Sequence, residues 1–463
     1  MINKRSFSIH THFYQPPRED PNSGAIPDEP GTGPYKNWNE NVLETCYRPN
    51  VELRNFSRLS FNLGPTLANW MGRAAPEVLE RIVNEDEVNQ AIYGAGNAIA
   101  QSYNHSILPL ANSRDKRTQA KWGITAFETL FHRAPEGLWL PETAVDMETL
   151  VVLADNHIKF TILAPWQVEV MEGKAPYEVE IKDGRSIVVF VYHGGLSSTV
   201  SFDTFATGNA DAFAEYYLKP EIDNYDPDQF LMIATDGELY GHHQPFRDKF
   251  LAHLLNGSVK ETGLQLTWPG LWLKQHTAKG KARIIDNTSW SCHHGVERWR
   301  AECSCTPGST WKAPLRRGLD QLNELIFLDF EKMCGDLGIE PLAARDAYIK
   351  VMLRMEKFED WIKALVKRDL TSSDIERVRK LFDAQVACQQ MFTSCGWFFD
   401  DLSRIEPRNN ISYAAHASAL MNQVTGNDYQ EAIQPILAGA VDEKNHLTAA
   451  DYLRSAYRRF SGQ

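Results

Sequence analysis

The chain has 463 residues, and its 43% hydrophobic and 23% charged content is that of an ordinary globular protein. Its formal net charge of -12, without any basic patch in the sequence, argues against a nucleic-acid partner. The apolar runs are too short to cross a bilayer, and the start MINKRSFSIH lacks the apolar stretch of a signal peptide, so we expect no membrane association and a cytoplasmic location. No pattern in the sequence indicates an oligomeric state.

Apolar strand-like runs alternate with helical segments from residue 6 to about residue 290. The runs are SFSIHTHF, RLSFNL, QAIYG, EGLWLPE, IKFTILA, IVVFVYH and QFLMIATDGE. Several are almost continuously apolar, as are parallel strands that are covered on both faces. Strands that alternate with helices predict a parallel α/β fold. Seven strands are few for an open sheet of this length and suit an incomplete parallel (β/α)7 barrel.

The strand pattern ends near Thr310. Apolar residues then recur at intervals of three and four from Leu315 to Leu337, which is the stripe of an amphipathic helix. Thr371 and Asp374 have the spacing of a capping box at the start of another helix. We therefore predict a barrel domain over residues 1–310 and a C-terminal α-helical bundle domain, of four or five helices, over residues 311–463.

Polar and ionisable residues follow several of the predicted strands at the point where each strand ends. They are His10, His12, His105, Glu142, Asp236 and Glu238. The carboxyl ends of parallel barrel strands meet around one mouth, where active sites lie, so these groups are expected to converge. Residues two apart on a strand share a face. His10 and His12 can therefore point the same way, and so can Asp236 and Glu238.

Two carboxylates from different strands suit glycoside chemistry, in which one attacks the anomeric carbon or activates water and the other protonates the departing oxygen. The segments HTHFYQP, SYNHSILPL, GLWLPE and TDGELYGHH, in this order, resemble glycoside hydrolase family 57. The resemblance covers roughly residues 6–300. The start HFYQPPRE is similar to that of one branch of the family.

This resemblance implies a seven-stranded barrel, retention of configuration, and action on an α-linked glucan or a related oligo- or polysaccharide, without a cofactor. Matched by position, Glu142 falls on the nucleophile of the family and Asp236 on its general acid/base. The three histidines fall on positions that contact sugar hydroxyls. Many members have Gln-Pro directly after the histidine pair, whereas Phe13 and Tyr14 precede Gln15 here, so the accepted sugar stays open.

Further substrate contacts are predicted around the two carboxylates, and each has a simpler alternative. The predicted residues are Trp139, Trp290, Glu238, His242 and His243, with Trp166 as a further ring that could stack on a sugar. A tryptophan is more often a core residue, and the two adjacent histidines could support the site without touching substrate. Glu142 could be a helix N-terminal carboxylate held by the helix dipole. Asp236 could be a structural hydrogen-bond acceptor.

A cysteine- and histidine-rich segment, SWSCHHGVERWRAECSC, follows the barrel pattern. Its Cys292, His293, His294, Cys303 and Cys305 are of types and spacings that could ligate zinc, with Cys395 as a distant ligand. A redox pair is a second interpretation. Reduced thiols are the default, because seven cysteines spread along the chain do not form a disulfide framework. We predict no metal at the reacting centre.

Two other classes of function remain open from the sequence. In a metal-dependent carbohydrate hydrolase, such as a deacetylase or an α-mannosidase, His10, His12 and Asp236 would be ligands and Glu142 a general base. The absence of an HxD opening motif counts against it. A catalytically silent carbohydrate-binding relative would not need the two catalytic carboxylates. Both are present here, which counts against this alternative.

Overall fold

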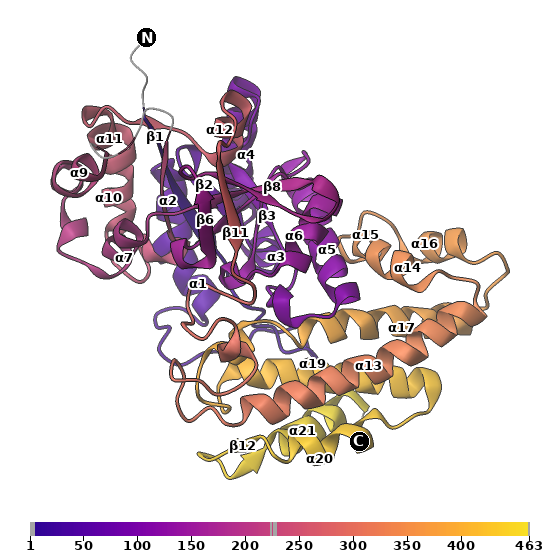
Figure 1. Cartoon of the computed structure of the whole chain (residues 1–463). Helices are drawn as coiled ribbons and strands as arrows, with labels where there is room; N and C mark the ends of the chain where they lie inside the picture. The colour runs from indigo at the N-terminus through magenta and orange to yellow at the C-terminus, as the bar shows by residue number, and fades with distance from the viewer. Residues whose placement is uncertain (1–4, 223–224, 226–228, 462–463) are drawn as a thin grey trace. The chain divides into compact units, whose positions relative to one another are not determined.

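The computed structural model of the protein describes residues 5–222, 225 and 229–461. The chain forms two compact units (Figure 1). The first contains residues 1–17, 27–103 and 127–290, and the second contains residues 18–26, 104–126 and 291–463. The domain boundary near residue 310 stays a prediction, and two short early segments fold with the C-terminal helices. Within the described ranges, no helix is both long and apolar enough to span a membrane.

Seven parallel strands of the first unit form the barrel. They are β1 (Ser6–Phe13), β2 (Ser60–Leu63), β3 (Ala98–Gln101), β4 (Leu138–Trp139), β5 (Phe160–Leu163), β8 (Ser186–Val191) and β9 (Phe230–Asp236). Ladders join them in the order β9–β1–β2–β3–β4, and a bridge between Gly137 and Phe160 leads on to β5, which pairs with β8. The His193 N–H donates to the Met232 carbonyl (2.7 Å), which joins β8 to β9. The fold is the predicted incomplete (β/α)7 barrel.

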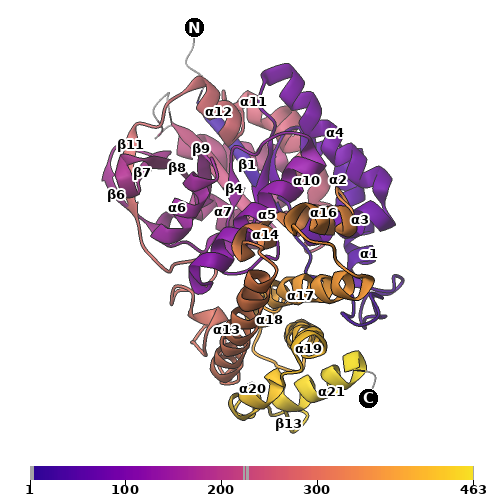
Figure 2. The ribbon, with the colours of Figure 1, turned by 90° about the vertical axis from the view of Figure 1, so that its right-hand side faces the viewer.

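Helices connect the barrel strands, and aromatic and aliphatic side chains fill the interior. The helices are α1 (Trp38–Val42), α2 (Arg48–Glu52), α3 (Pro65–Ala74), α4 (Pro76–Tyr93), α5 (Ser113–Phe131), α6 (Met147–Asp155), α7 (Gly194–Phe202), α8 (Ala210–Phe213), α9 (Lys219–Ile222), α10 (Arg247–His253), α11 (Val259–Glu261) and α12 (Pro269–Gln275). Figure 2 shows β1, β4, β8 and β9 grouped inside the first unit. The core between them includes Ile99, Trp139, Phe160, Phe190 and Met232. This packing fixes the positions of the strand ends.

A smaller sheet lies at the edge of the barrel unit. The strands β6 (Val168–Glu172), β7 (Tyr177–Glu180) and β11 (Gly280–Ile284) extend β8 in the order β8–β7–β11–β6, as Figure 2 shows. Strand β10 (Gln265–Leu266) pairs with the start of β1. Strands β10 and β11 come before and after α12 in the sequence. Both follow β9, so the last two strands of the unit are not among the seven barrel strands.

One predicted strand is wrong. The run QAIYG, taken as the third strand, is the last turn of α4 and the residue after it, and the third strand begins at Ala98. Gly94 ends the helix in the left-handed conformation (φ 68°), which is a common helix terminator. Ile92 and Tyr93 are exposed at 66% and 49%, so this apolar run is not a buried strand. A short apolar run does not by itself distinguish a strand from a helix end.

The second unit is helical, and its described C-terminal part has nine α-helices, so the predicted number of four or five is wrong. Its helices within the described C-terminal part are α13 (Lys312–Asp336), α14 (Pro341–Ala347), α15 (Ile349–Met352), α16 (Phe358–Leu365), α17 (Ser372–Gln390), α18 (Cys395–Phe398), α19 (Ile405–Thr425), α20 (Tyr429–Leu437) and α21 (Ala449–Ser461), and β12 (Val441–Asp442) pairs with β13 (Leu447–Thr448). The predicted stripe lies on α13, where Leu315 and Leu319 are fully buried. The capping box is confirmed, because Thr371 and Asp374 each bond the backbone N–H of the other.

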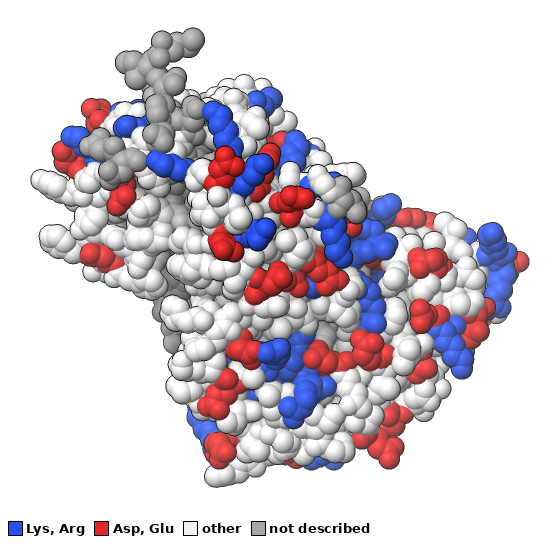
Figure 3. Space-filling model, in the orientation of Figure 1, with Lys and Arg blue, Asp and Glu red and all other residues white. Residues whose placement is uncertain are grey.

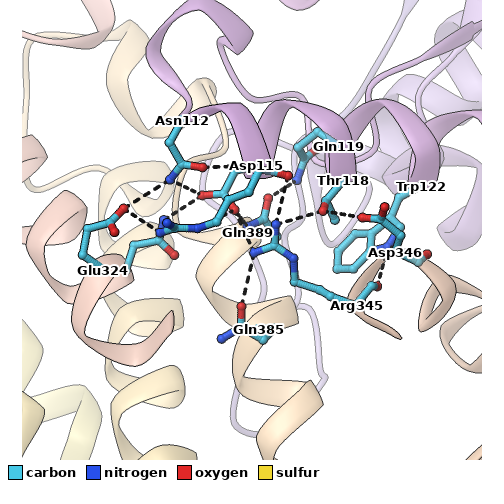
Figure 4. A network of polar contacts seen from close by, with 12 residues as sticks. Asn112, Asp115, Thr118, Gln119, Trp122, Glu324, Arg345, Asp346, Gln385 and Gln389 are labelled. Atoms are coloured by element: carbon cyan, nitrogen blue, oxygen red, sulfur yellow. Dashed lines mark hydrogen bonds and ion pairs between the residues drawn. The ribbon is translucent and has the colours of Figure 1, made fainter. Parts of the chain in front are cut away.

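A buried polar network joins four helices, α5, α13, α14 and α17 (Figure 4). Arg345 forms an ion pair with Asp115 (2.8 Å). The second oxygen of Asp115 accepts hydrogen bonds from the side-chain amides of Asn323 (2.7 Å) and Asn112 (2.8 Å), and Gln389 donates to the first (3.0 Å). Both carboxylate oxygens of Asp115 therefore have donors, which is what a buried charge requires.

The surface charges are mixed in sign. On the face shown in Figure 3, Lys and Arg side chains alternate with Asp and Glu side chains, and no large patch carries one sign. A nucleic-acid-binding face has a basic patch or stripe. The face in Figure 3 lacks this feature.

Candidate active site

His10 and His12 lie on the same face of β1 and are almost completely buried. His10 bonds Ser60 Oγ through Nδ1 (2.9 Å), and its Nε2 lies 3.3 Å from Asn62 Oδ1. His12 Nδ1 also bonds the Asn62 amide, at 3.2 Å from Oδ1. Burial, helped by the charge of His12, lowers the pKa of His10 to about 3, and burial lowers the pKa of His12 to about 4. Both rings are therefore neutral near pH 7, suited to hydrogen bonding rather than to charge.

Aromatic rings surround this pair of histidines. Trp139, the last residue of β4, stacks on His10 and His12 with ring centroids 4.8 and 5.1 Å away. Trp290 meets Trp139 edge-on at 5.1 Å. Trp139 exposes none of its surface, which favours a supporting role over the predicted contact with a sugar, whereas Trp290 is only half-buried. Trp166 is 49% exposed, and its indole N–H donates to the Ser289 carbonyl.

Glu142 lies in a turn directly after β4 and has a strained backbone. Its φ and ψ of 56° and 21° are left-handed, as is the φ of 48° at Thr143, and non-glycine residues seldom adopt this region. Trp290 donates its backbone N–H to the Glu142 carbonyl (3.0 Å) and its indole N–H to Glu142 Oε2 (2.9 Å). Gln167 exchanges two hydrogen bonds with Thr143, each of 2.8 Å. These contacts hold the strained turn in place, as is typical of functional sites.

Asp236 ends β9, opposite His12 in the ladder between β9 and β1. Its side chain remains accessible to water, while protein atoms crowd its other sides. Burial and then the negative charge of Glu142 raise the pKa of Asp236 to about 7. The Asp236 charge in turn adds to the burial that raises the pKa of the Tyr192 hydroxyl. The carboxyl groups of Glu142 and Asp236 are thus close enough for each charge to affect the other.

The backbone conformation of the residues after Asp236 differs from the predicted strand. Strand β9 stops at Asp236, and Gly237–Leu239 forms a 3-10 turn, so Asp236 and Glu238 do not share a strand face. A Cβ atom on Gly237 would lie 2.3 Å from the Phe13 ring, so only glycine fits here. The prediction of a shared face is wrong because it extended the strand by two residues.

Glu238 is 5% exposed and is bound to the segment after β1. Its Oε1 accepts hydrogen bonds from the Tyr14 backbone N–H (3.1 Å) and the Tyr47 hydroxyl (2.6 Å). Burial raises the pKa of Glu238 to about 8, the Tyr47 hydrogen bond lowers it, and the Asp236 charge raises it. These contacts favour a role in positioning the loop over the predicted contact with substrate.

The remaining predicted histidines lie in other surroundings. His242 bonds Thr45 Oγ1 through Nδ1 (3.3 Å), and its ring is next to His243, which is exposed. His105 belongs to the second unit, where its Nδ1 bonds Ser394 Oγ (2.6 Å) and its φ is 54°. The predicted sugar contacts of these three residues stay predictions.

Three residues near the two histidines and Asp236 were not found from the sequence. Asn62 donates to Gln101 Oε1 (2.7 Å), which extends the hydrogen-bond chain from β1 across β2 to β3. Tyr192 follows β8 and lies near Asp236. Each stands at or just after the end of a barrel strand, so the rule that identified Glu142 and Asp236 could have found them too.

Ionisable side chains, neutral imidazoles and an accessible indole at the carboxyl ends of parallel barrel strands are the features of a barrel enzyme's active site. The sequence matches glycosyl hydrolase family 57 over residues 9–284, which is more than half of the chain, so the protein belongs to this family. Residues 309–456 match a domain of unknown function, DUF3536. No curated protein matches the sequence.

Several solved structures share the fold. An exo-type maltose-forming amylase from Pyrococcus sp. ST04 is similar with a TM-score of 0.73, 15% identity, and 94% of this chain and 82% of that chain covered. A branching enzyme of the same family from Pyrococcus horikoshii has a TM-score of 0.61, 14% identity, and coverage of 99% and 95%. An alpha-amylase from Thermotoga maritima has a TM-score of 0.60, 12% identity, and coverage of 97% and 99%. At these identities the likeness shows the fold, and the family membership supports a glycoside hydrolase or transglycosylase.

Proposed function

We propose that this protein is a retaining glycoside hydrolase or transglycosylase that acts on an α-linked glucan, or a related α-glycan, through a covalent glycosyl-enzyme intermediate. Glu142 is the nucleophile and Asp236 the general acid/base. The observation that carries the proposal is the pair of carboxyl groups at two strand ends: Glu142 follows β4 and is bonded by Trp290, and Asp236 ends β9 opposite His12, where the Glu142 charge helps to raise its pKa. A carboxyl that titrates near neutrality beside a second carboxyl has the properties that a retaining mechanism requires.

In the first step, protonated Asp236 gives its proton to the departing glycosidic oxygen while a Glu142 oxygen attacks the anomeric carbon. The carbon–oxygen bond breaks, and the sugar becomes esterified to Glu142. The Trp290 indole N–H, 2.9 Å from Glu142 Oε2, orients the attacking carboxylate. Because the pKa of Asp236 is raised to about 7, this carboxyl can carry the required proton near neutral pH, which an ordinary aspartate rarely does.

In the second step, the ester at Glu142 has no charge, so it no longer raises the pKa of Asp236. Asp236 then ionises and accepts a proton from water or from a sugar hydroxyl as that oxygen attacks the anomeric carbon. The Glu142 ester bond breaks, and the configuration is retained overall. One residue therefore serves as acid and then as base because the charge of its neighbour changes between the steps.

The glycan class is inferred from the relatives. The solved structures with the same fold are described as a maltose-forming amylase, a branching enzyme and an alpha-amylase, and their coverage extends over both units. From these descriptions we infer that the substrate of this protein is also an α-glucan. We also keep the proposal that residues 1–310 contain the reacting groups.

Azide rescue tests the two roles. Glu142→Ala should abolish turnover, and azide should restore it with a glycosyl azide of inverted configuration. Asp236→Ala should still react with substrates that carry good leaving groups, because these need little protonation. In that variant azide should replace water in the second step and give a product of retained configuration. An exchange of the two product configurations would reverse the roles of Glu142 and Asp236.

Geometry and product analysis extend this test. In a crystal structure the two carboxyl groups should lie about 5–6 Å apart, as retaining enzymes require. A separation of more than about 10 Å would contradict the proposal. A panel of α-glucans, followed by both reducing ends and product chain lengths, then distinguishes hydrolysis from chain transfer and branching.

Chelation tests the metal-dependent alternative. Both ring nitrogens of His10 are engaged by Ser60 and Asn62, and among the described residues no group of potential ligands that includes His10, His12 and Asp236 lies within reach of one ion. We expect activity to survive chelation at a temperature at which the protein stays folded. Loss of turnover with its restoration by added zinc would support the metal-dependent hydrolase instead.

A further inference from the structure

We propose that Cys292, His294, Cys303 and Cys305 bind one zinc ion in a four-coordinate structural site. The four side chains belong to the second unit and follow the last residue of the barrel unit. One potential ligand atom from each lies within 4.8 Å of the other three. The site is independent of the glycosidase proposal.

Two of the distances between the four ligand atoms match the edges of a tetrahedron around zinc, and the others are within 4.8 Å. With zinc–sulfur bonds of about 2.3 Å and zinc–nitrogen bonds of about 2.0 Å, tetrahedral edges are about 3.8 Å between sulfurs and about 3.5 Å between sulfur and nitrogen. The Sγ atoms of Cys292 and Cys303 are 3.9 Å apart, and Cys305 Sγ is 3.6 Å from His294 Nδ1. A disulfide needs about 2.05 Å between its sulfurs, so the cysteine pair is arranged as ligands and not as a bridge.

The histidine has the support that a zinc ligand requires. His294 turns Nδ1 toward Cys305, and its Nε2 lies 3.2 Å from Ser304 Oγ. A histidine that binds a metal through one ring nitrogen usually donates a hydrogen bond from the other, which fixes the tautomer. Ser304 can accept this hydrogen bond. The adjacent His293 is outside the cluster, so the two histidines differ in role.

The backbone also prepares the sulfurs for a metal. Cys292 Sγ accepts backbone N–H groups from His294 and Arg298, and Cys303 Sγ accepts them from Cys305 and Thr306. These N–H groups favour negative charge on both sulfurs, although burial outweighs them at Cys292 and raises the pKa of its thiol to about 11. Two Cys-x-ligand pairs, at positions 292 and 294 and at 303 and 305, thus come together from either side of the short 3-10 helix Glu297–Trp299.

A buried lysine balances the charge of the proposed centre. Three thiolates and a neutral histidine around Zn²⁺ leave one negative charge. Lys312 is fully buried, and its Nζ donates to Thr306 Oγ1 (3.0 Å), which lies 3.9 Å from Cys303 Sγ. Asp400 and Arg298 also face Lys312, and their charges oppose each other. The ammonium group is therefore positioned to offset the zinc–thiolate charge.

The zinc ion would hold an irregular segment. Between Trp290 and the start of α13, the described chain contains only the short 3-10 helix Glu297–Trp299, and connections of this length without secondary structure are uncommon. Trp299 and Cys292 anchor the segment as buried residues. A zinc ion would join positions 292 and 305 and reduce the freedom of the loop in the unfolded chain.

Metal analysis of the full-length protein, purified with reductant and without chelators, tests the site directly. We expect about one zinc per chain, released when the thiols are modified. Cobalt exchanged into the site should show the intense visible bands and the sulfur-to-cobalt absorption of a tetrahedral thiolate site. Absence of bound metal together with seven reactive thiols, or a disulfide between Cys292 and Cys303 by mass spectrometry, would overturn the proposal.

Two matched pairs of variants locate the ion. His294→Gln and Cys305→Ser should each weaken zinc binding by roughly 10²-fold or more, since losing even a supporting hydrogen bond costs 10–100-fold. The neighbouring His293→Gln and the half-buried Cys395→Ser should keep one zinc per chain, because both residues lie outside the cluster. Equal zinc content in all four variants would place the metal elsewhere and contradict the assignment.

Chelation of the wild-type protein covers the case in which the variants do not fold. Removing zinc should lower the melting temperature by several degrees and speed proteolysis within residues 291–311, and zinc but not magnesium should reverse both effects. A melting temperature and cleavage pattern that do not change on chelation would overturn the structural role.

Discussion

The strand ends of the barrel and the polar network of the second unit both contain carboxyl groups closely surrounded by protein atoms, but the two regions differ in whether a cation pairs with them. In the second unit, Asp115 faces Arg345 and is bonded by three amide side chains, as Figure 4 shows. At the barrel strand ends, no cation pairs with Asp236 or Glu238 within the described residues, and the pKa values of both groups are raised. The network of the second unit stabilises the negative charge of Asp115. The barrel strand ends instead disfavour the negative charges of Asp236 and Glu238.

This difference separates a structural site from a reactive one. A paired, hydrogen-bonded charge contributes to specific packing, and breaking it is costly. A carboxyl group left without a cation and placed near another carboxyl group gains affinity for protons, which is what a general acid at neutral pH needs. Burial alone therefore does not distinguish a structural carboxyl group from a candidate catalytic one, and the presence or absence of a paired cation is the more informative feature.

The largest expected effect is on turnover. Asp236→Asn should lower kcat by roughly 10²–10⁴-fold on substrates with poor leaving groups. The wild-type rate should fall as pH rises through about 7, where Asp236 loses its proton, and the variant should lack this limb. Kinetics from pH 5 to 9 check this, with the exposed Asp211→Asn as control. A variant that keeps the wild-type rate and pH profile would remove Asp236 from the reaction.

Breaking the paired charge should act on stability instead. Arg345→Met removes the nearer cation of the buried Asp115, leaves only Arg114 at 4.0 Å, and should cost about 3–5 kcal/mol of unfolding free energy. Denaturant unfolding followed by a signal from the second unit measures it. Lys380→Met, which breaks a surface pair with Glu376 on α17, should change stability far less. Equal effects of the two variants would show that the network is not the stabilising element.

The indole of Trp290 should have an intermediate effect on activity. Trp290→Phe removes the donor to Glu142 Oε2 and keeps most of the ring, and a hydrogen bond to a charged group is worth about 1.5–3 kcal/mol. We expect kcat to fall about 10–100-fold and the acid limb of the pH profile to move to higher pH. Trp311→Phe is the control, because its indole N–H donates to the Asp400 carbonyl within the second unit. A change in KM alone would assign Trp290 to sugar binding.

The smallest expected effect is a pH-dependent gain in stability. The pKa of Glu238 is raised from 4.5 to about 8, so ionisation of this group in the folded protein costs stability progressively between those pH values. Glu238→Gln can still accept the hydrogen bonds of Tyr14 and Tyr47 and should raise the melting temperature at pH 8. Below pH 4, where the carboxyl is neutral in both states, the difference should vanish. A gain that is independent of pH would contradict this cause.

Much of the fold could be predicted from the sequence, because alternating apolar runs and helical segments define a parallel barrel without knowledge of its contacts. The strand-end rule placed Glu142 and Asp236 at the mouth. It could not show that β9 stops at Asp236, which turns Glu238 toward Tyr14 and Tyr47. That outcome depends on packing of Gly237 against Phe13, a contact between residues far apart in the chain.

Other features depended on three-dimensional proximity in the same way. The sequence does not reveal that Trp139 is fully buried beneath the histidines, or that residues 104–126 pack with the C-terminal helices and place His105 in the second unit. The cysteine-rich segment suggested a metal, but its spacing did not select among the ligands. The structure groups His294 with three cysteines and leaves Cys395 outside.

The left-handed turn at Glu142 has an evolutionary consequence. A non-glycine residue in this conformation costs about 1–2 kcal/mol, and glycine or asparagine would relieve much of that cost. A population of this protein released from selection for turnover would therefore drift toward a more stable and inactive sequence through a single substitution at position 142. Among its descendants, higher thermal stability would then accompany loss of catalysis. A natural variant with Gly or Asn at this position should be unusually stable and inactive.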